Sequence, residues 1–177
     1  NQNDGQLSRQ TRSTLAAEAF RTTAIYDAGI ATWILEHTGA EQTSAVAPPV
    51  QLGLSTGHTL RYGENPHQAA WAYPARSGDG VLQAKQLSGK ELSYNNLADA
   101  AAALDLVTDL GQNAPAAAAI IKHTNPCGAA AGDEPLSVLD NAWSGDPVAA
   151  FGGILALWSK VDLPLAEHIA QPGRFLE

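Results

Sequence analysis

An unbroken run of six apolar residues, 116–121, constrains this 177-residue chain more than any other stretch. The run has the length of a strand, and it ends in Lys122 and His123, which residues 125–128 (Asn-Pro-Cys-Gly) follow as a predicted turn. An apolar run bounded by turn residues is typical of a strand that is buried on both faces, as in a sheet covered by helices. Such sheets bind ligands beyond the carboxyl ends of their strands. The sequence therefore predicts a site at Lys122 and His123.

Helical spacing of apolar residues predicts the elements around this strand. Residues 8–36 form one long helix or two short ones with a break at Gly29, and a second helix has Asn96 as its N-cap and Gly111 just past its end. Two shorter helices are expected at residues 136–143 and 165–169, and weaker strands at residues 69–73, 81–87 and 148–157. This order of helices and strands predicts an α/β fold with a mainly parallel sheet.

Small and polar residues at 38–49, ending in Pro48-Pro49, read as a linker. We therefore expect a helical segment in residues 1–47 and an α/β unit in residues 48–177. The chain contains no Met and ends without a polar tail, which indicates an internal piece of a longer protein.

Composition narrows the classes of partner. Ten Lys and Arg against eighteen Asp and Glu give a net charge of −8 and no basic stripe, which disfavours non-specific binding to nucleic acid. No stretch approaches the ~20 apolar residues of a membrane span. Cys127 is the only cysteine, so an internal disulfide framework is excluded, and the chain is compatible with a reducing cytoplasm.

Lys122 and His123 are the strongest candidates for catalytic residues in the chain. His offers general-base catalysis and Lys offers charge stabilisation for a developing oxyanion. The alternative is a strand-end Lys in solvent beside a His whose ring is hydrogen-bonded to a backbone carbonyl.

Other residues suit an anionic or flat ligand. Arg61 and Tyr62 could hold a phosphate, since Arg supplies a planar fork of donors; the alternative is a surface Arg next to a half-buried Tyr. Asn96 could present its amide to an anion or merely cap its helix. Phe151 could stack on a ring while Gly152 allows close approach, or the glycine could mark a strand kink.

The residues around Pro126-Cys127 only partly match the zinc-deaminase signature H-x-E followed by P-C-x-x-C. Pro126-Cys127 is followed by no second Cys, and Asn125 stands where the signature needs Glu. The ligands of a metal-dependent deaminase cannot be assembled, so no metal site is predicted.

Four sequence motifs, taken together in their order along the chain, identify a family more specifically than any single residue does. They read LRYGENPHQ (60–68), KQLSGKELSYNNLADAAAAL (85–104), AAIIKHTNPCGAAAG (118–132) and DPVAAFGGILAL (146–157). In this order they resemble the PurH family of bifunctional purine-biosynthesis enzymes, which join 5-aminoimidazole-4-carboxamide ribonucleotide (AICAR) transformylase to IMP cyclohydrolase. The similarity runs from about residue 7 to residue 177.

The resemblance implies a helical connecting segment and the first part of the transformylase domain, an incomplete cytidine-deaminase-like unit without zinc. The implied reaction moves a formyl group from the co-substrate 10-formyltetrahydrofolate to the 5-amino group of AICAR. The resemblance further implies that the full-length protein is a cytoplasmic homodimer that also closes the product to IMP. Cyclohydrolase residues lie upstream, and folate-site residues are expected downstream of residue 177.

By the same resemblance, His123 is the catalytic base and Lys122 stabilises charge on the formyl oxygen. The residues implied at the nucleotide are Arg61, Tyr62, Asn96, Phe151, Gly152 and Glu177. Where the family usually reads DPVSAFGG, this chain has Ala149 in place of Ser. The alternative function is a non-catalytic nucleotide-binding or dimerisation module.

Overall fold

The protein was analysed as a computed structural model, which describes residues 6–38, 57–75 and 78–177. The chain divides into two compact units, residues 1–55 and residues 56–177. The expected boundary at residues 47/48 and all of the predicted linker except Thr38 lie outside the described residues.

Helix α1, Arg9–Thr38, is the described helix of the first unit. Its first turn is capped by Ser8, whose hydroxyl oxygen accepts the backbone N–H of Thr11 at 3.0 Å. The helix runs through Gly29 without a break, so the prediction of one long helix is the correct alternative. Among the described residues, no helix is both long enough and apolar enough to cross a membrane.

The second unit is built on a three-stranded sheet in the order β4-β3-β5. Its strands are β3 (Ala116–Lys122), β4 (Asn125–Gly132) and β5 (Ile154–Leu157), and β3 pairs with both neighbours in antiparallel orientation. The predicted α/β class is confirmed in the sense that helices and sheet are mixed, but the mainly parallel sheet is wrong. A two-residue connection between β3 and β4 permits only antiparallel pairing, because parallel strands need a long crossover.

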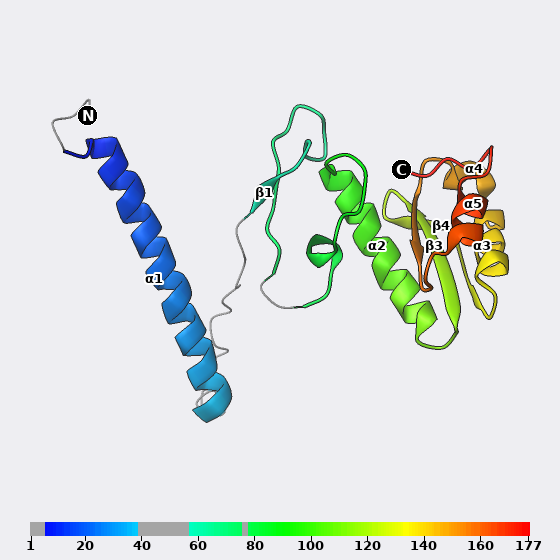
Figure 1. Ribbon diagram of the computed structural model, residues 1–177, viewed down its shortest axis with the longest axis horizontal. Coiled ribbons are helices and arrows are strands. Elements are labelled where there is room, and N and C mark those ends of the chain that lie inside the picture. The colour runs from blue at the N-terminus through cyan, green and yellow to red at the C-terminus, as the bar shows by residue number, and fades with distance from the viewer. Residues whose placement is uncertain (1–5, 39–56, 76–77) are drawn as a thin grey trace. The chain divides into compact units, whose positions relative to one another are not determined.

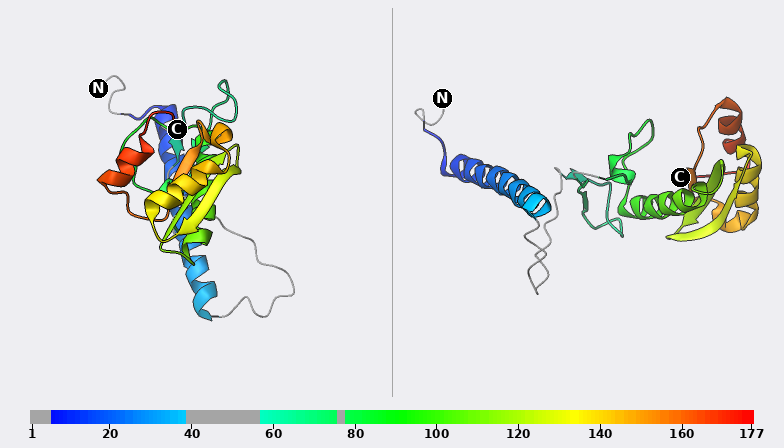
Figure 2. Two further views of the ribbon diagram at one scale, coloured as in Figure 1. Left: turned by 90° about the vertical axis from the view of Figure 1, so that its right-hand side faces the viewer. Right: turned by 90° about the horizontal axis from the view of Figure 1, so that it is seen from below.

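Strand β3 is the buried centre of this unit. Residues 116–121 are each at most 1 % exposed, which confirms the predicted fully buried strand. Side chains at even positions pack against α3 (Pro135–Ser144), and those at odd positions against α2 (Tyr94–Gly111). The sheet therefore lies between the two helices, as Figures 1 and 2 show.

The turn between β3 and β4 begins two residues earlier than predicted. His123 and Thr124 form it, with φ of 54° and 61°, and Lys122 pairs with Asn125 across it. The predicted turn at residues 125–128 is wrong, because this stretch is the start of β4. An irregularity in the pairing of Ile120 and Ile121 accommodates the extra residue on β4.

Helix α2 begins and ends differently from the prediction. Ser93, not Asn96, is the N-cap, and the two residues form a reciprocal capping box. Gly111 is the last helical residue, and Gln112 follows it with a right-handed φ of −62°. A side chain at Gly111 would overlap the ring of Trp158, so close packing, not a left-handed turn, explains this glycine.

The remaining elements are short. They are β1 (His58–Thr59) paired with β2 (Trp71–Ala72), the 3₁₀ turn η2 (Val81–Gln83), α4 (Pro147–Ala150) and α5 (Leu163–Ile169). The predicted strand at 81–87 is wrong, because Gly80 and Val81 carbonyls accept local N–H groups rather than bonds from a ladder. The predicted strand at 148–157 is correct only for its second half. The helices predicted at 136–143 and 165–169 are confirmed as α3 and α5.

Candidate functional site

The pair Arg61-Tyr62 lies against the start of α2. The Arg61 N–H donates to the Leu92 carbonyl at 3.1 Å, and the Tyr94 N–H donates to the Tyr62 carbonyl at 3.1 Å. These two backbone bonds place the pair beside the first turn of the helix.

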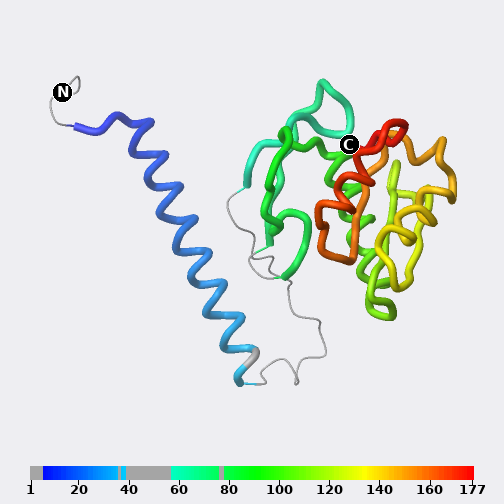
Figure 3. The backbone as a smooth tube through the Cα atoms, turned by 45° about the vertical axis from the view of Figure 1, so that its right-hand side comes forward, coloured from blue at the N-terminus to red at the C-terminus, as the bar shows by residue number. Residues whose placement is uncertain are grey.

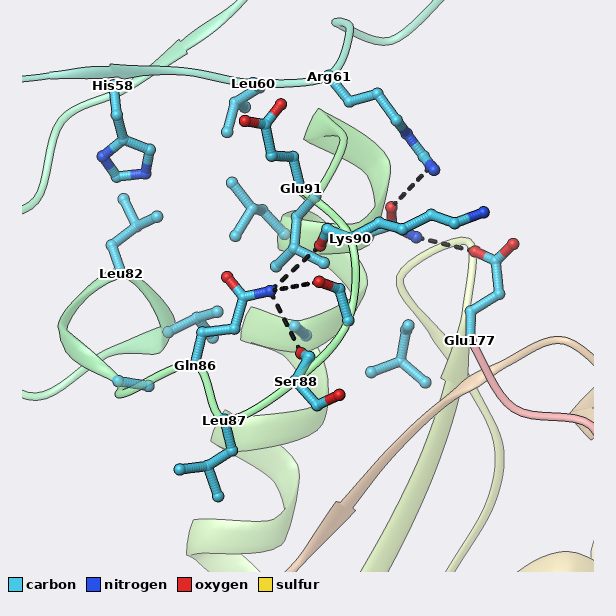
Figure 4. A pocket seen from close by; sticks show the side chains of 18 of the residues that line it. His58, Leu60, Arg61, Leu82, Gln86, Leu87, Ser88, Lys90, Glu91 and Glu177 are labelled. Carbon is cyan, nitrogen blue, oxygen red and sulfur yellow. Dashed lines mark hydrogen bonds between the residues drawn. The ribbon is translucent and has the colours of Figure 1, made fainter. Parts of the chain in front are cut away.

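Asn96 is held in a fixed orientation by the N-cap. Its side-chain oxygen accepts the Ser93 N–H at 3.1 Å and the Ser93 hydroxyl at 2.9 Å, and Ser93 itself is only 1 % exposed. The same oxygen accepts Arg61 Nη2 at 3.3 Å, while Asn96 Nδ2 donates to Glu177 Oε2 at 2.8 Å (Figure 4). Asn96 thus joins an arginine and a glutamate that are far apart in the sequence.

Arg61 is oriented by its neighbour as well. Its guanidinium carbon lies 4.9 Å from the centre of the Tyr62 ring, and Nη2 donates to the Tyr62 hydroxyl at 3.3 Å. Arg61 makes no ion pair with any residue in the described part of the chain. Its positive charge is therefore available to an anionic ligand.

The segment that carries Glu177 is fixed to the glycines after α4. The Glu177 N–H donates to the Gly153 carbonyl at 3.1 Å, and the Gly152 N–H donates to the Phe175 carbonyl at 2.7 Å. Gly152 has a φ of 77°, a conformation that glycine adopts readily. The backbone traced in Figure 3 returns at its end to the start of α2, in agreement with the bond between Glu177 and Asn96.

Lys122 and Phe151 meet at the end of β3. Lys122 Nζ donates to the Phe151 carbonyl at 2.8 Å, and the Phe151 ring lies 5.3 Å from that of Phe175. The alternative interpretation expected a Lys122 side chain that extends into solvent. The structure instead has it hydrogen-bonded to the Phe151 carbonyl.

His123 presents its imidazole from the turn that follows. The residue is exposed, and its ring makes no hydrogen bond to any residue that the structure describes. Its backbone N–H donates to Asp99 Oδ2 at 3.1 Å. The alternative interpretation, in which the His123 ring is hydrogen-bonded to a backbone carbonyl, does not agree with the contacts of the described residues.

A cavity of about 940 Å³ adjoins part of this group (Figure 4). Arg61, Asn96 and Glu177 line it, together with residues 81, 82 and 84–92 and the apolar side chains of Leu60 and Leu97. Tyr62, Lys122, His123, Phe151 and Gly152 are not among its lining residues. The structure therefore links the predicted residues by a chain of contacts, and only three of them face this cavity.

The electrostatic setting of Cys127 does not favour metal or nucleophilic chemistry. Burial raises the pKa of the Cys127 thiol, against the opposing effect of Lys122. Within residues 6–38, 57–75 and 78–177, no three His, Cys, Asp or Glu side chains are grouped so that they could hold a metal ion.

Sequence reasoning missed two residues that position the site. Ser93 stands three residues before Asn96, which is the spacing of a capping box and could have revealed it. Asp99 stands three residues after Asn96, on the same face of the helix, and contacts the turn at His123. That contact joins residues 24 apart, and local patterns do not reveal it.

Comparison with known proteins decides the family. The model of the family described as AICARFT/IMPCHase bienzyme matches residues 1–177. The chain belongs to this family. It is 45 % identical over 175 residues to the bifunctional purine biosynthesis protein PurH of Synechococcus elongatus, covering 98 % of this chain and 33 % of that protein.

Other PurH proteins are similarly close. That of Limosilactobacillus reuteri is 45 % identical over 170 residues, covering 94 % of this chain and 31 % of the relative. The PurH protein of Acidithiobacillus ferrooxidans is 43 % identical over 177 residues, covering 99 % of this chain and 33 % of the relative. The chain thus spans about a third of the length of these curated relatives.

Proposed function

We propose that this chain supplies part of a transformylase site that moves a formyl group from 10-formyltetrahydrofolate to the 5-amino group of AICAR. The product is formyl-AICAR, which the full-length enzyme closes to IMP. The observation that carries the proposal is Asn96, which bonds Arg61 on one side and Glu177 on the other, and all three residues line one cavity. The family membership supports the same reaction.

The nucleotide would be held by residues that the structure already orients. Arg61 makes no ion pair within the described residues and offers its charge and a fork of donors to the phosphate, and Tyr62 adds a hydroxyl. The Asn96 amide and the Glu177 carboxylate suit the ribose hydroxyls. Phe151 and Gly152 would lie along the base.

His123 and Lys122 would carry the chemistry. The amino nitrogen of AICAR attacks the formyl carbon, and a proton leaves that nitrogen for the imidazole of His123. Negative charge develops on the formyl oxygen, where the ammonium of Lys122 stabilises it. The bond from the formyl carbon to the folate nitrogen then breaks, and that nitrogen takes a proton. The bond from Lys122 to the Phe151 carbonyl uses one donor of three and leaves two for the substrate.

Several broader features belong to the same proposal. We infer a cytidine-deaminase-like unit in residues 48–177, preceded by a connecting segment in residues 1–47. The full-length protein would be a cytoplasmic homodimer whose two subunits share each site, with folate contacts beyond residue 177. No zinc is required by this chemistry.

The test is formyl transfer to AICAR by the chain alone and by a full-length chimera in which it replaces the matching segment of the Synechococcus elongatus relative. We expect transfer by the chimera only. His123→Ala in the chimera should lower kcat by about 10²–10⁴-fold, the usual contribution of a general base, while AICAR binding measured by calorimetry is retained.

His37→Ala is the matched control, because His37 lies in α1, where its ring bonds the Trp33 carbonyl and stacks on the Trp33 ring, whereas the predicted site residues belong to the unit of residues 56–177. It should leave kcat unchanged. Transfer that survives His123→Ala at full rate would remove this residue from the mechanism. A chimera that binds AICAR without any transfer would favour a nucleotide-binding module instead.

A further inference from the structure

We propose that Asp99 is a positioning residue that fixes the backbone of His123, and thereby its imidazole, relative to the nucleotide-binding residues. The catalytic part of this inference rests on the proposed function. Its structural part stands on the contacts of Asp99 alone.

The turn that carries His123 is unfavourable by its own sequence. Both of its residues have positive φ, His123 at 54° and Thr124 at 61°. Two-residue hairpin turns of this kind strongly favour Asn-Gly or Asp-Gly, and a β-branched residue at positive φ is an outlier. Something outside the turn must therefore hold it in this conformation.

Asp99 supplies that hold from α2. Its Oδ2 accepts the His123 N–H at 3.1 Å, and its Oδ1 accepts the Thr124 N–H at 2.6 Å. Both carboxylate oxygens are used, and hydrogen bonds to a charged acceptor are stronger than those between neutral groups. The side chain is half-buried, so water competes less for these bonds than at an exposed position.

The carbonyl of His123 is fixed as well. It accepts the Thr124 hydroxyl at 2.7 Å and the Asn125 side-chain amide at 2.8 Å. The backbone donor and acceptor of His123 are thus both occupied, while its ring is free of bonds to the described residues. This is the arrangement expected of a base whose position is set by its backbone.

The same helix face also carries the nucleotide-binding contacts. Asn96 lies one turn before Asp99 and bonds Arg61 and Glu177. A rigid turn of α2 therefore sets the distance between the proposed base and the proposed substrate ligands. A displacement of about 1 Å in such a constellation can lower a rate by about 10²-fold.

Asp99→Asn is the decisive substitution, because Asn keeps the shape but has only one oxygen to accept the two N–H groups. In the ¹⁵N-labelled chain we expect amide exchange at His123 and Thr124 to rise by about tenfold or more. In the full-length chimera we expect kcat to fall by about 10–10²-fold while the KM for AICAR stays within about twofold. Asp105→Asn is the matched control, with the same charge change at an exposed position of the same helix, and should alter none of these values.

A second variant separates positioning from general damage. Glycine adopts positive φ without strain, so Thr124→Gly combined with Asp99→Asn should restore much of the lost protection and of kcat. Amide exchange and kcat in Asp99→Asn equal to those of Asp105→Asn would overturn the proposal, as would a loss that Thr124→Gly does not restore. If His123→Ala leaves transfer intact, the proposed function fails, and the exchange measurement still decides whether Asp99 holds the turn.

Discussion

At the residue scale, Asp140 joins three segments outside the site. One of its carboxylate oxygens accepts His168 Nε2 at 2.8 Å and Arg174 Nη2 at 2.5 Å. Arg174 also lies over the Trp143 ring, 5.5 Å from its centre. These contacts tie α3 to α5 and to the strand-like segment that leads to Glu177. The hydrogen bond from Arg174, followed by that from His168, lowers the pKa of Asp140.

The lowered pKa of Asp140 makes the free energy of unfolding depend on pH, and the stabilisation is lost at low pH. A carboxyl whose pKa is lowered by folding stabilises the protein above its unfolded pKa of about 3.9, and the contribution is lost as pH falls through the folded value. Asp140→Asn should therefore lower the free energy of unfolding by about 0.5–1 kcal/mol at pH 7, a small effect because the side chain is 49 % exposed.

The difference between Asp140→Asn and the unchanged chain should shrink below about pH 4, as followed by urea unfolding from pH 7 to pH 3. Asp105→Asn, an exposed acid of α2, should show no such difference. A difference that stays constant down to pH 3 would contradict the assignment.

Some features of the candidate site could be predicted from the sequence, and others could not. Lys122 was predictable because an apolar run ends there, and β3 does end at that residue. The conformation of His123 was not, because neither His nor Thr favours positive φ and the stabilising carboxylate comes from α2. The bond between Asn96 and Glu177 spans 81 residues, and only the family resemblance suggested that the two belong together.

At the element scale, the end of α2 depends on close packing against the residue after β5. Gly111 is buried in the last turn of the helix, and the Trp158 ring occupies the space where a side chain would lie. The backbone N–H of Trp158 donates to the Ala117 carbonyl at 2.8 Å, so the backbone that carries this ring is fixed to the sheet.

Gly111→Ala should lower the free energy of unfolding by about 1–3 kcal/mol, the usual cost of overpacking a core. Helix propensity alone predicts the opposite, a gain of about 0.5–1 kcal/mol. Gly29→Ala in α1 is the control, because outside the local helix backbone no atom of the described residues lies within 4 Å of the added carbon, and only the propensity gain is expected. Thermal unfolding of both variants, followed by tryptophan fluorescence, tests this; a Gly111→Ala chain more stable than the original would refute the packing argument.

Helices and strands were predictable where their apolar residues form a continuous run or recur at helical spacing. The apolar run of β3 and the spacing in α3 and α5 indicated their type correctly. Strand direction was not, because burial on both faces is the same for parallel and antiparallel strands. The start of strand β4 reads as a turn because it contains Asn, Pro and Gly. Gly128 is instead small because α3 lies against it, where a side chain would overlap the Ala142 carbonyl.

At the scale of the whole molecule, the described core and the candidate site belong to one of the two units. Every buried apolar residue among those described lies between Leu60 and Leu165. The predicted site residues, from Arg61 to Glu177, lie in residues 56–177 as well. Folding of this unit is therefore expected to depend on its own side chains, which bury β3 between two helices.

A chain that begins at Gly57 should consequently fold and keep the contacts of the site. Its sheet and covering helices are all present, so we expect a single cooperative unfolding transition and unchanged amide chemical shifts for β3, α2 and the turn at His123. AICAR affinity should match that of the 177-residue chain within about twofold, because Asn96 bonds both Arg61 and Glu177 within this unit. Calorimetry and ¹H–¹⁵N spectra of the two chains make the comparison. Collapse of the β3 and α2 signals in the shortened chain would show that residues 1–56 complete its core, and the two-unit description would then have to be abandoned.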